Sequence, residues 1–338
     1  MHYPITLNFK WANKSMLETY NFDLQELFNG NEPLTFLVGA GISISPPSCL
    51  ASASQIMNSI IQFSAPPDAA EDLISGASIK DLRYESIIQD FRDWIDEELK
   101  FMEYFNQAEK PNAIHNFLAK MIKKGHYVMT TNFDYLIERA LGIDNPNARI
   151  VITEENFTKF GNPEKNIRDN LEVLYKIHGS LQNILTGEDT KSSIVTTIDD
   201  LGKDKGENIF SVEIFKREFF NRVCENRTLI VMGYSGGDDF DIVPVLMHME
   251  NIKRIVWIFH EDIPFESSKY FLISPKDELL GNEEKSSQID IILQNLSDSA
   301  DIEVIKIVGN TASLLLGSQF LSKSELKNEE EIRNVLDP

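Results

Sequence analysis

Four short stretches of the sequence concentrate the residue types that bind phosphates, hold hydroxyl groups and move protons. They are GAGIS (39–43), TTNFD (130–134), KIHGS (176–180) and GYSGGDDFD (233–241). Each stretch follows or ends a run of large apolar residues, so we expect each to end a buried strand. In an open α/β sheet the carboxyl ends of parallel strands lie at one edge, where ligands bind. We therefore expect the four stretches to form one crevice.

Three side chains in these stretches are suited to catalysis. A neutral His178 can accept a proton, and the Asn132 amide both donates and accepts hydrogen bonds. Asp134 can orient a hydroxyl group or balance a developing positive charge. Structural roles are the alternative. His178 can be a satisfied structural residue, and Asn132 and Asp134 can cap a helix that starts at Tyr135.

The glycines of GAGIS have two interpretations. Gly39 and Gly41 can form a tight turn and nothing more. They can also let backbone amides approach a diphosphate, with the positive end of the following helix aimed at it. The GYSGGDDFD stretch, starting at Gly233, is the other glycine-rich strand end. Its acids, Asp238, Asp239 and Asp241, would suit a metal ion, although acids before a helix commonly face the helix dipole.

Strand and helix patterns alternate along the chain and predict the elements that must position these residues. Apolar runs suited to parallel strands lie at 34–40, 126–132, 171–179, 227–235, 254–260 and 302–309. This alternation predicts an α/β fold, with a Rossmann-like, doubly wound and mainly parallel sheet.

The segments between the strands differ in character. Residues 111–125 predict a helix with Pro111 in its first turn, Gly125 at its end and His115 as a packing residue. Residues 50–108 predict two or three helices inserted after the first strand. Residues 181–208 predict a loop with one short strand at SSIVTTI.

The ends of the chain suggest a domain division. We expect one nucleotide-binding domain over residues 1–320, with the helical insertion at about 50–108 inside it. Residues 321–338 predict a charged helix that leads to a partner or a further domain. The inserted helices also carry an apolar stripe, suited to self-association; its members are Ile87, Ile88, Phe91, Trp94 and Ile95.

Composition excludes several partners. The formal net charge is −21, which repels nucleic-acid phosphates and anionic lipid. Cys49 and Cys224 form no C-x-x-C pair, so we expect no structural zinc, and no metal, in the protein. The sequence has no signal-peptide pattern and no stretch of 18 apolar residues, so we expect a cytoplasmic protein.

A dinucleotide-binding dehydrogenase fits poorly. Its G-x-G-x-x-G fingerprint needs a third glycine where this chain has Ile44. It also needs an acid about 20 residues further on, and residues 55–65 contain none.

The four stretches, in this order, resemble the sirtuins. The specific parts are PNAIHNFLAKMIKKG running into TTNFD, and the His-Gly pair at 178–179. The resemblance spans about residues 34–260 and implies an inverted Rossmann arrangement that binds NAD+ as substrate. It also implies His178 as general base, with Asn132 and Asp134 holding the nicotinamide ribose and carboxamide. The implied cofactor contacts are Gly39, Ala40, Gly41, Ser43, Thr131, Asn132, Asp134, Gly233, Tyr234, Ser235 and Asp238.

Departures from the protein-deacylating sirtuins narrow the expected activity. The four zinc-ribbon cysteines are absent after His178–Gly179, and ISPPSCLAS follows GAGIS. These features resemble the bacterial sirtuin-like branch that hydrolyses NAD+ in antiphage defence, which implies a regulated NAD+ hydrolase acting by abortive infection. The resemblance further implies a homo-oligomer and a phage-derived or system-encoded activator or sensor partner.

Other functions remain open on the same residues. The alternatives are a non-catalytic sensor of NAD+ or an ADP-ribose derivative and, less well supported, a protein deacylase or ADP-ribosyltransferase. A sensor needs the glycine loops but no base, so the presence of His178 and Asn132 favours the enzyme.

Overall fold

The computed structural model describes residues 20–75, 84–195, 212–236, 242–249, 251–273, 288–300 and 302–317. Within them, one eight-stranded sheet has the order β3-β4-β2-β1-β7-β8-β10-β9. Its strands are β1 (Leu34–Val38), β2 (Tyr127–Thr130), β3 (Ala148–Val151), β4 (Glu172–Lys176), β7 (Thr228–Met232), β8 (Arg254–His260), β9 (Lys269–Ile273) and β10 (Glu303–Gly309). All neighbours pair in parallel except β9, which is antiparallel to β10. The predicted mainly parallel α/β sheet is confirmed.

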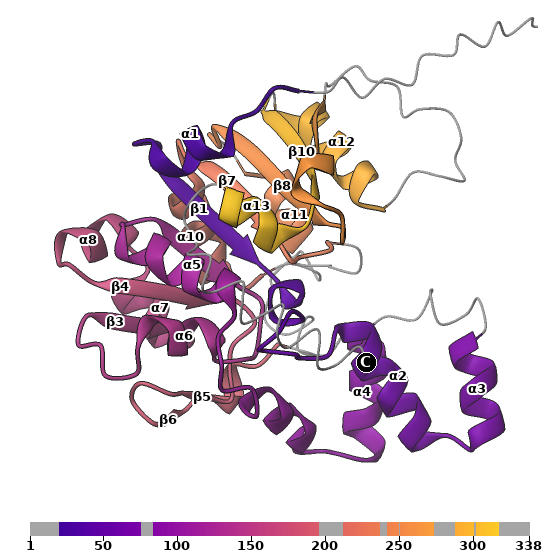
Figure 1. Ribbon diagram of the computed structural model, residues 1–338. Coiled ribbons are helices and arrows are strands. Elements are labelled where there is room, and N and C mark those ends of the chain that lie inside the picture. The colour runs from indigo at the N-terminus through magenta and orange to yellow at the C-terminus, as the bar shows by residue number, and fades with distance from the viewer. Residues whose placement is uncertain are drawn as a thin grey trace, which may run out of the picture.

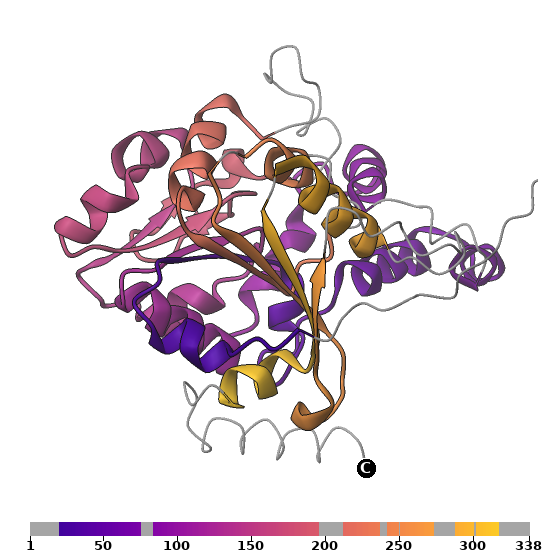
Figure 2. The same ribbon diagram turned by 90° about the horizontal axis from the view of Figure 1, so that it is seen from above.

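Helices cover both faces of the sheet, as Figure 2 shows from above. One face carries α1 (Leu24–Asn29), α5 (Ala113–Lys123), α6 (Leu136–Leu141) and α13 (Thr311–Gly317). The other carries α7 (Glu154–Phe160), α10 (Ile214–Cys224), α11 (Ile242–Met247) and α12 (Gln288–Ala300), while α8 (Pro163–Arg168) precedes β4. Alternate residues of each strand enter opposite cores: Phe36 packs on the first face and Leu37 on the second. Burial on both faces explains why the strands read as continuous apolar runs.

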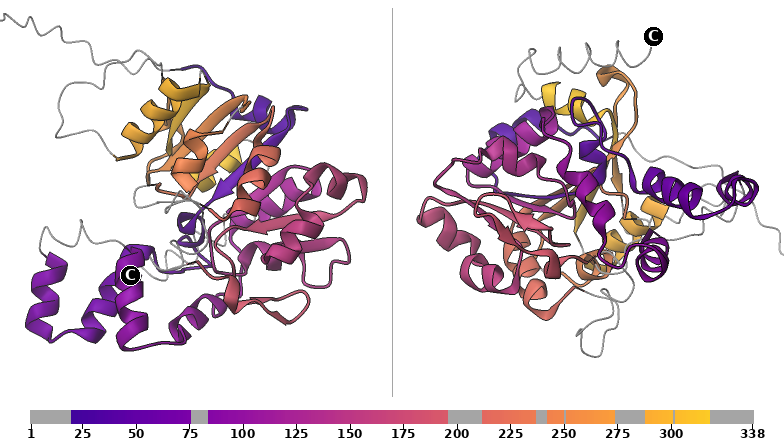
Figure 3. Two further views of the ribbon diagram at one scale, coloured as in Figure 1. Left: turned by 180° about the vertical axis from the view of Figure 1, so that it is seen from behind. Right: turned by 90° about the horizontal axis from the view of Figure 1, so that it is seen from below.

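Between β1 and α5 the chain forms helices that lie to one side of the sheet (Figures 1 and 3). They are η1 (Ala40–Ser43), α2 (Ala53–Ser64), α3 (Pro67–Ser75), α4 (Tyr84–Trp94) and η3 (Lys100–Asn106). We call α2 to η3 the helical insert. Its core contains Ile60, Ile88, Met102 and Phe105, together with Leu136 at the start of α6 and Ile194 from the segment after β4. The insert is therefore packed onto the loops that follow β2 and β4.

Two local predictions were wrong. Pro111 lies before the N-cap of α5, since the Asn112 side chain accepts hydrogen bonds from the amides of Ile114 and His115. Residues 191–193 of the expected strand region form a 3-10 turn, η4 (Lys191–Ser193), and 194–195 are in no strand; residues 196–198 lie outside the described ranges. A two-stranded hairpin, β5 (Gln182–Asn183) and β6 (Glu188–Asp189), precedes this turn, and η5 (Phe265–Ser267) precedes β9.

His126 joins β1 to β2 and makes the fold sensitive to acid. Its Nδ1 accepts a hydrogen bond from the Leu34 amide at 3.3 Å. Burial, with the positive charges of Arg227 and Lys124 nearby, lowers the pKa of His126 from 6.5 to about 4. The unfolded state therefore binds more protons than the folded state between these values. Stability from this group is complete above pH 6.5 and is lost as the pH falls from 6.5 to about 4.

We expect His126→Gln to lessen this loss, because glutamine keeps an acceptor for the Leu34 amide and does not titrate. Between pH 7 and pH 5 its free energy of unfolding should fall by about 1 kcal/mol less than that of the unmodified protein, allowing for the partial exposure of His126. Denaturant titrations at the two pH values measure this difference. The exposed His248 gives the control variant His248→Gln, which should behave like the unmodified protein. Equal losses in His126→Gln and the unmodified protein would contradict the assignment.

Candidate functional site

The four polar stretches follow four neighbouring strands, β4, β2, β1 and β7. From β1 the chain goes to β2, then to the edge strand β3 and back to β4 between them, and it continues on the other side of β1 with β7. The strand order thus reverses at β1, and its carboxyl end is the switch point of the sheet. In doubly wound sheets this is where ligands bind.

The loops after β1 and β7 pack backbone against backbone. The Gly41 amide donates to the Gly233 carbonyl at 2.8 Å, and the Gly39 amide donates to the Met232 carbonyl at 3.2 Å. A Cβ on Gly41 would lie 2.8 Å from the Gly233 Cα, and one on Gly39 would lie 2.7 Å from the Gly233 oxygen. Gly233 itself has φ +63°, and a Cβ there would approach the Ile42 nitrogen to 2.5 Å. All three glycines are required by the contact between the loops.

This contact corrects the role expected for the glycines of GAGIS. The amides of Gly39 and Gly41 donate to protein carbonyls, so they are not open donors aimed at a diphosphate. The element that follows is η1, a four-residue 3-10 turn, and the first longer helix begins only at Ala53. The expected helix dipole at this loop is therefore absent as well.

A directional chain of hydrogen bonds crosses the site from α5 to the loop after β2. His115 Nδ1 accepts from the Asn112 amide at 3.2 Å, which leaves its Nε2 as the donor to Ser43 Oγ at 3.1 Å. The Ser43 hydroxyl then donates to Asp134 Oδ2 at 2.8 Å. His115 is fully buried, and burial lowers its pKa from 6.5 to about 4, so it is neutral in this chain.

The same chain fixes the orientation of Asn132. Its Nδ2 donates to Ser43 Oγ at 3.2 Å and to Asp134 Oδ2 at 3.3 Å. Because Ser43 Oγ and Asp134 Oδ2 both act as acceptors here, they pair with the amide nitrogen of Asn132 and not with its oxygen. Oδ1 therefore points away from them. Oδ1 is buried and accepts no hydrogen bond from any described residue. An unsatisfied buried acceptor is costly and points to a donor that the protein itself does not supply.

A small cavity of about 100 Å³ adjoins Asn132. Its sheet-side wall comes from the predicted site stretches and comprises Ala40, Ser43, Thr131, Asn132, Phe133 and Asp134. Its other wall comes from the segment 50–56 and the helical insert and comprises Leu50, Ala51, Ala53, Ile56, Tyr84 and Phe105. The structure therefore gathers five of the predicted site residues at one cavity and closes it with the insert.

Asp134 also has part of the structural role that the sequence allowed. Its Oδ1 accepts from the Leu136 amide at 3.0 Å, at the start of α6. Its other carboxylate oxygen remains for Ser43 and Asn132. One side chain thus caps a helix and belongs to the polar network.

His178 lies in the turn after β4 and is half-buried. It does not line the 100 Å³ cavity, but its ring centroid is 6.5 Å from that of Phe133, which does. Its carbonyl accepts from the Val195 amide at 2.9 Å, and Gly179 beside it has φ +79°. His178 thus lies next to Phe133, a residue of the cavity wall, without lining the cavity itself.

The remaining predicted residues belong to the loop after β7. Tyr234 is half-buried, with its ring 6.0 Å from that of Trp257, and Ser235 is exposed. Asp238, Asp239 and Asp241 lie outside the described residues. No group of three or more His, Cys, Asp or Glu side chains with metal-binding geometry occurs among the residues that are described.

Sequence reasoning missed three contributors to this site. His115, expected only to pack, donates into the polar network through Ser43. Lys176 and Lys216 are buried beside the loops of Asp134 and His178. In the sequence, Lys176 could be recognised as a charged residue within the mainly apolar run 171–179. A lysine buried at such a position needs a partner for its ammonium group.

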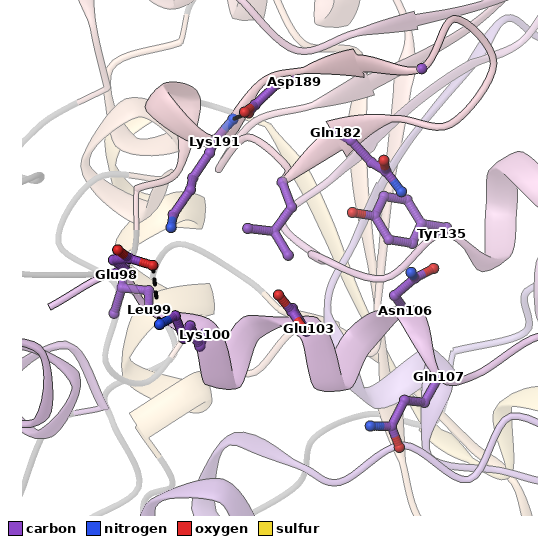
Figure 4. Close-up of a pocket in the computed structure, with 12 residues that line it drawn as sticks. Glu98, Leu99, Lys100, Glu103, Asn106, Gln107, Tyr135, Gln182, Asp189 and Lys191 are labelled. Atoms are coloured by element: carbon purple, nitrogen blue, oxygen red, sulfur yellow. Dashed lines mark hydrogen bonds and ion pairs between the residues drawn. The ribbon is translucent and has the colours of Figure 1, made fainter. Parts of the chain in front are cut away.

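A larger cavity of about 600 Å³ lies between η3 and the β5–β6 hairpin (Figure 4). Tyr135, Glu103 and Lys191 are among the residues that line it. None of the predicted site residues lines this cavity. Two of its lining residues, Tyr135 and Leu181, directly follow the predicted stretches TTNFD and KIHGS.

Comparison with known protein families places part of the chain in one family. Residues 126–292 match the model of the SIR2-like domain family. The chain contains a SIR2-like domain. SIR2-like domains are NAD-utilising enzymes, and the matched range includes Asn132, Asp134, His178 and Gly233. The GAGIS loop precedes that range but contacts it through Gly233 and Asp134.

No curated protein matches the chain. Among the described helices, none has both the length and the apolar character needed to cross a bilayer.

Proposed function

We propose that this protein hydrolyses NAD+ at the bond between nicotinamide and ribose, giving nicotinamide and ADP-ribose. The observation that carries the proposal is the buried, unsatisfied Oδ1 of Asn132, held at a cavity by the Ser43–Asp134 network. A ribose hydroxyl, a water molecule or a carboxamide N–H would each supply the missing donor. The SIR2-like match supports NAD+ as the molecule that brings it.

The proposed reaction assigns a role to each candidate catalytic residue. The C1′–nitrogen bond breaks with its electron pair leaving on neutral nicotinamide, while positive charge develops on the ribose. Asn132 holds the hydroxyl or water, and the Asp134 carboxylate balances the developing charge. Oxygen of water bonds to C1′, and its proton passes to neutral His178 and then to solvent.

We assign the loops after β1, β2 and β7 to the rest of the dinucleotide. The residues concerned are Gly39, Ala40, Gly41, Ser43, Thr131, Gly233, Tyr234, Ser235 and Asp238. In this assignment NAD+ packs closely against the backbone of the paired glycine loops. It does not bind the amides of Gly39 and Gly41, which donate to protein carbonyls. The division into a domain of 1–320 and a segment of 321–338 belongs to the same proposal.

The size of the cavity at Asn132 supports a regulated enzyme. A volume of about 100 Å³ is well below the roughly 300–1,000 Å³ of pockets for drug-sized ligands, so a dinucleotide requires a wider site. The insert supplies a third of the residues that line the cavity, namely Ala53, Ile56, Tyr84 and Phe105. We propose that movement of the insert opens the site, in a cytoplasmic effector of abortive infection triggered by a phage-derived or system-encoded activator. An unregulated NAD+ hydrolase would deplete its own cell.

A matched assay separates the proposal from its alternatives. Purified protein is incubated with NAD+, and free nicotinamide and ADP-ribose are quantified with and without candidate activators. Hydrolysis predicts the two products in equal amounts. NAD+ binding without nicotinamide release would favour a sensor, and ADP-ribose transferred to protein would favour a transferase.

The structure changes which apolar side chains of the insert are assigned to self-association. Ile88 is fully buried, and the Phe91 ring is half-buried between Phe63 and Phe101, so these residues stabilise the insert itself. Among the described residues of the insert, the large exposed apolar side chains are Trp94 (83%), Phe63 (75%), Ile95 (48%) and Leu73 (41%). We propose that this exposed set forms the contact between copies of the chain and that assembly favours the open insert.

Replacing Trp94 and Phe63 together by serine should lower both the assembled mass and NAD+ turnover, since assembly is what opens the site. Light scattering and nicotinamide release, measured on the same samples, follow the two quantities. Ile143→Ser removes an exposed apolar side chain (47%) outside the insert and serves as the control. If the unmodified protein were a fully active monomer, the proposed regulation by assembly would be refuted.

A further inference from the structure

Two lysines beside the candidate site are buried to an unusual degree. Lys176, at the end of β4, is 0% exposed, and Lys216, in α10, is 2% exposed. Lysine is almost never fully buried unless its ammonium group is paired. Each of these ammonium groups binds a backbone carbonyl in or next to a candidate catalytic residue, in addition to an acid.

Lys176 Nζ binds the loop that follows β2. It donates to the Asp134 carbonyl at 2.6 Å and to Glu138 Oε1 at 2.8 Å, and it lies 3.4 Å from the Phe133 carbonyl. It also lies 4.9 Å from the centre of the Tyr135 ring. The main chain on both sides of the Asp134 side chain is therefore tied to β4.

Lys216 Nζ binds the turn that carries His178. It donates to the Ile177 carbonyl at 2.7 Å and to Glu213 at 2.9 Å. The Ile177 carbonyl belongs to the same peptide plane as the His178 nitrogen. The rings of Phe215 and Phe157, at 5.5 and 5.9 Å, cover this ammonium group.

We propose that Lys176 and Lys216 are positioning residues, which hold the peptide planes of Asp134 and His178 in the geometry required for NAD+ cleavage. This inference rests on the proposed hydrolase. Neither lysine touches the cavity at Asn132 in this assignment, so both act through the residues they hold. A buried ion pair is weak evidence for stability, because apolar replacements of both partners are often neutral or stabilising. The carbonyl contacts, in contrast, have no apolar substitute.

The difference between the ion pair and the carbonyl contacts of Lys176 can be tested with two variants. Lys176→Met leaves Glu138, which is 2% exposed, without its cation and should lower the thermal midpoint. The double variant Lys176→Met/Glu138→Leu removes both charges and should recover the midpoint. Its turnover of NAD+ should remain roughly tenfold to a hundredfold low, in kcat rather than KM, because the loop is still released. Recovery of turnover together with the midpoint would overturn the proposal for Lys176.

Lys216 permits a simpler test, since Glu213 is partly exposed to water. Lys216→Met should keep its thermal midpoint near that of the unmodified protein and lose kcat to a similar degree; normal kcat would overturn its role. The control is Lys306→Met/Asp290→Leu, which removes a part-buried pair between β10 and α12 and should leave kcat unchanged.

Hydrogen exchange provides a readout that does not depend on hydrolysis. Amide exchange over residues 133–138 should be faster in Lys176→Met/Glu138→Leu, and exchange over 177–180 should be faster in Lys216→Met, than in the unmodified protein. Unchanged exchange would overturn the inference. If the unmodified protein releases no nicotinamide under any condition, the hydrolase proposal fails while this test still decides whether the lysines hold the two loops.

Discussion

Nicotinamide release by the His178→Ala variant is expected to fall roughly 10²–10⁴-fold, the loss typical of a missing general base. His178 is half-buried in a turn, so its removal leaves no large core cavity and the thermal midpoint should change little. Single-turnover assays with NAD+ measure the chemical step directly. NAD+ affinity, measured by calorimetry, should stay within a few-fold of its original value.

His248→Ala is the matched control, since His248 is an exposed histidine in the turn that follows α11. It should release nicotinamide at the unmodified rate. If His178→Ala kept near-normal turnover, His178 would not be the base. Hydrolysis would then depend on Asp134 and Asn132 alone.

Gly41→Val is expected to produce the second large effect, a loss of more than tenfold in NAD+ affinity together with a thermal midpoint lower by several degrees. Its Cβ would lie 2.8 Å from the Gly233 Cα and 2.9 Å from the Gly233 oxygen, so the two loops must separate. Calorimetry with NAD+ and thermal unfolding measure the two quantities on one preparation.

The combination of effects distinguishes two roles for Gly41. A side chain that only obstructed phosphates would weaken affinity and leave the midpoint unchanged. The structure instead predicts that both fall. Gly187→Asn is the control, because Gly187 (φ +74°) has open space around its Cβ position and asparagine tolerates this backbone conformation. An unchanged affinity and midpoint in Gly41→Val would contradict the packing role.

The sheet could be predicted from the sequence where its strands are buried on both faces. The six predicted runs each contain one of β1, β2, β4, β7, β8 and β10. Two strands gave no such signal. β3 is only four residues long, includes Arg149 and lies at one edge, and β9 lies at the other edge as the antiparallel strand. An edge strand has one neighbour and needs fewer apolar residues, so its pattern is weaker.

The candidate site was predictable as a set of loops but not as a set of contacts. Small and polar residues after apolar runs marked the loops, because those positions end strands at the same edge of the sheet. The hydrogen bonds of Ser43 with His115 and Asp134 join residues 72 and 91 positions apart, which no local pattern reveals. The glycines of GAGIS were expected to let a diphosphate approach the backbone, whereas in the structure the backbone of Gly233 approaches Gly41.

The core of the helical insert has a thermodynamic consequence. It includes Leu136, two residues beyond Asp134, and Ile194, in the loop beyond His178, with Phe133 packed against it. The insert and both candidate catalytic loops therefore repack together. By linkage, any molecule that binds the insert and changes NAD+ affinity by some factor must find its own affinity changed by that same factor when NAD+ is bound. An activator of this protein would thus double as a reporter of the cell's NAD+ concentration, binding more tightly while substrate is plentiful and releasing as it is consumed.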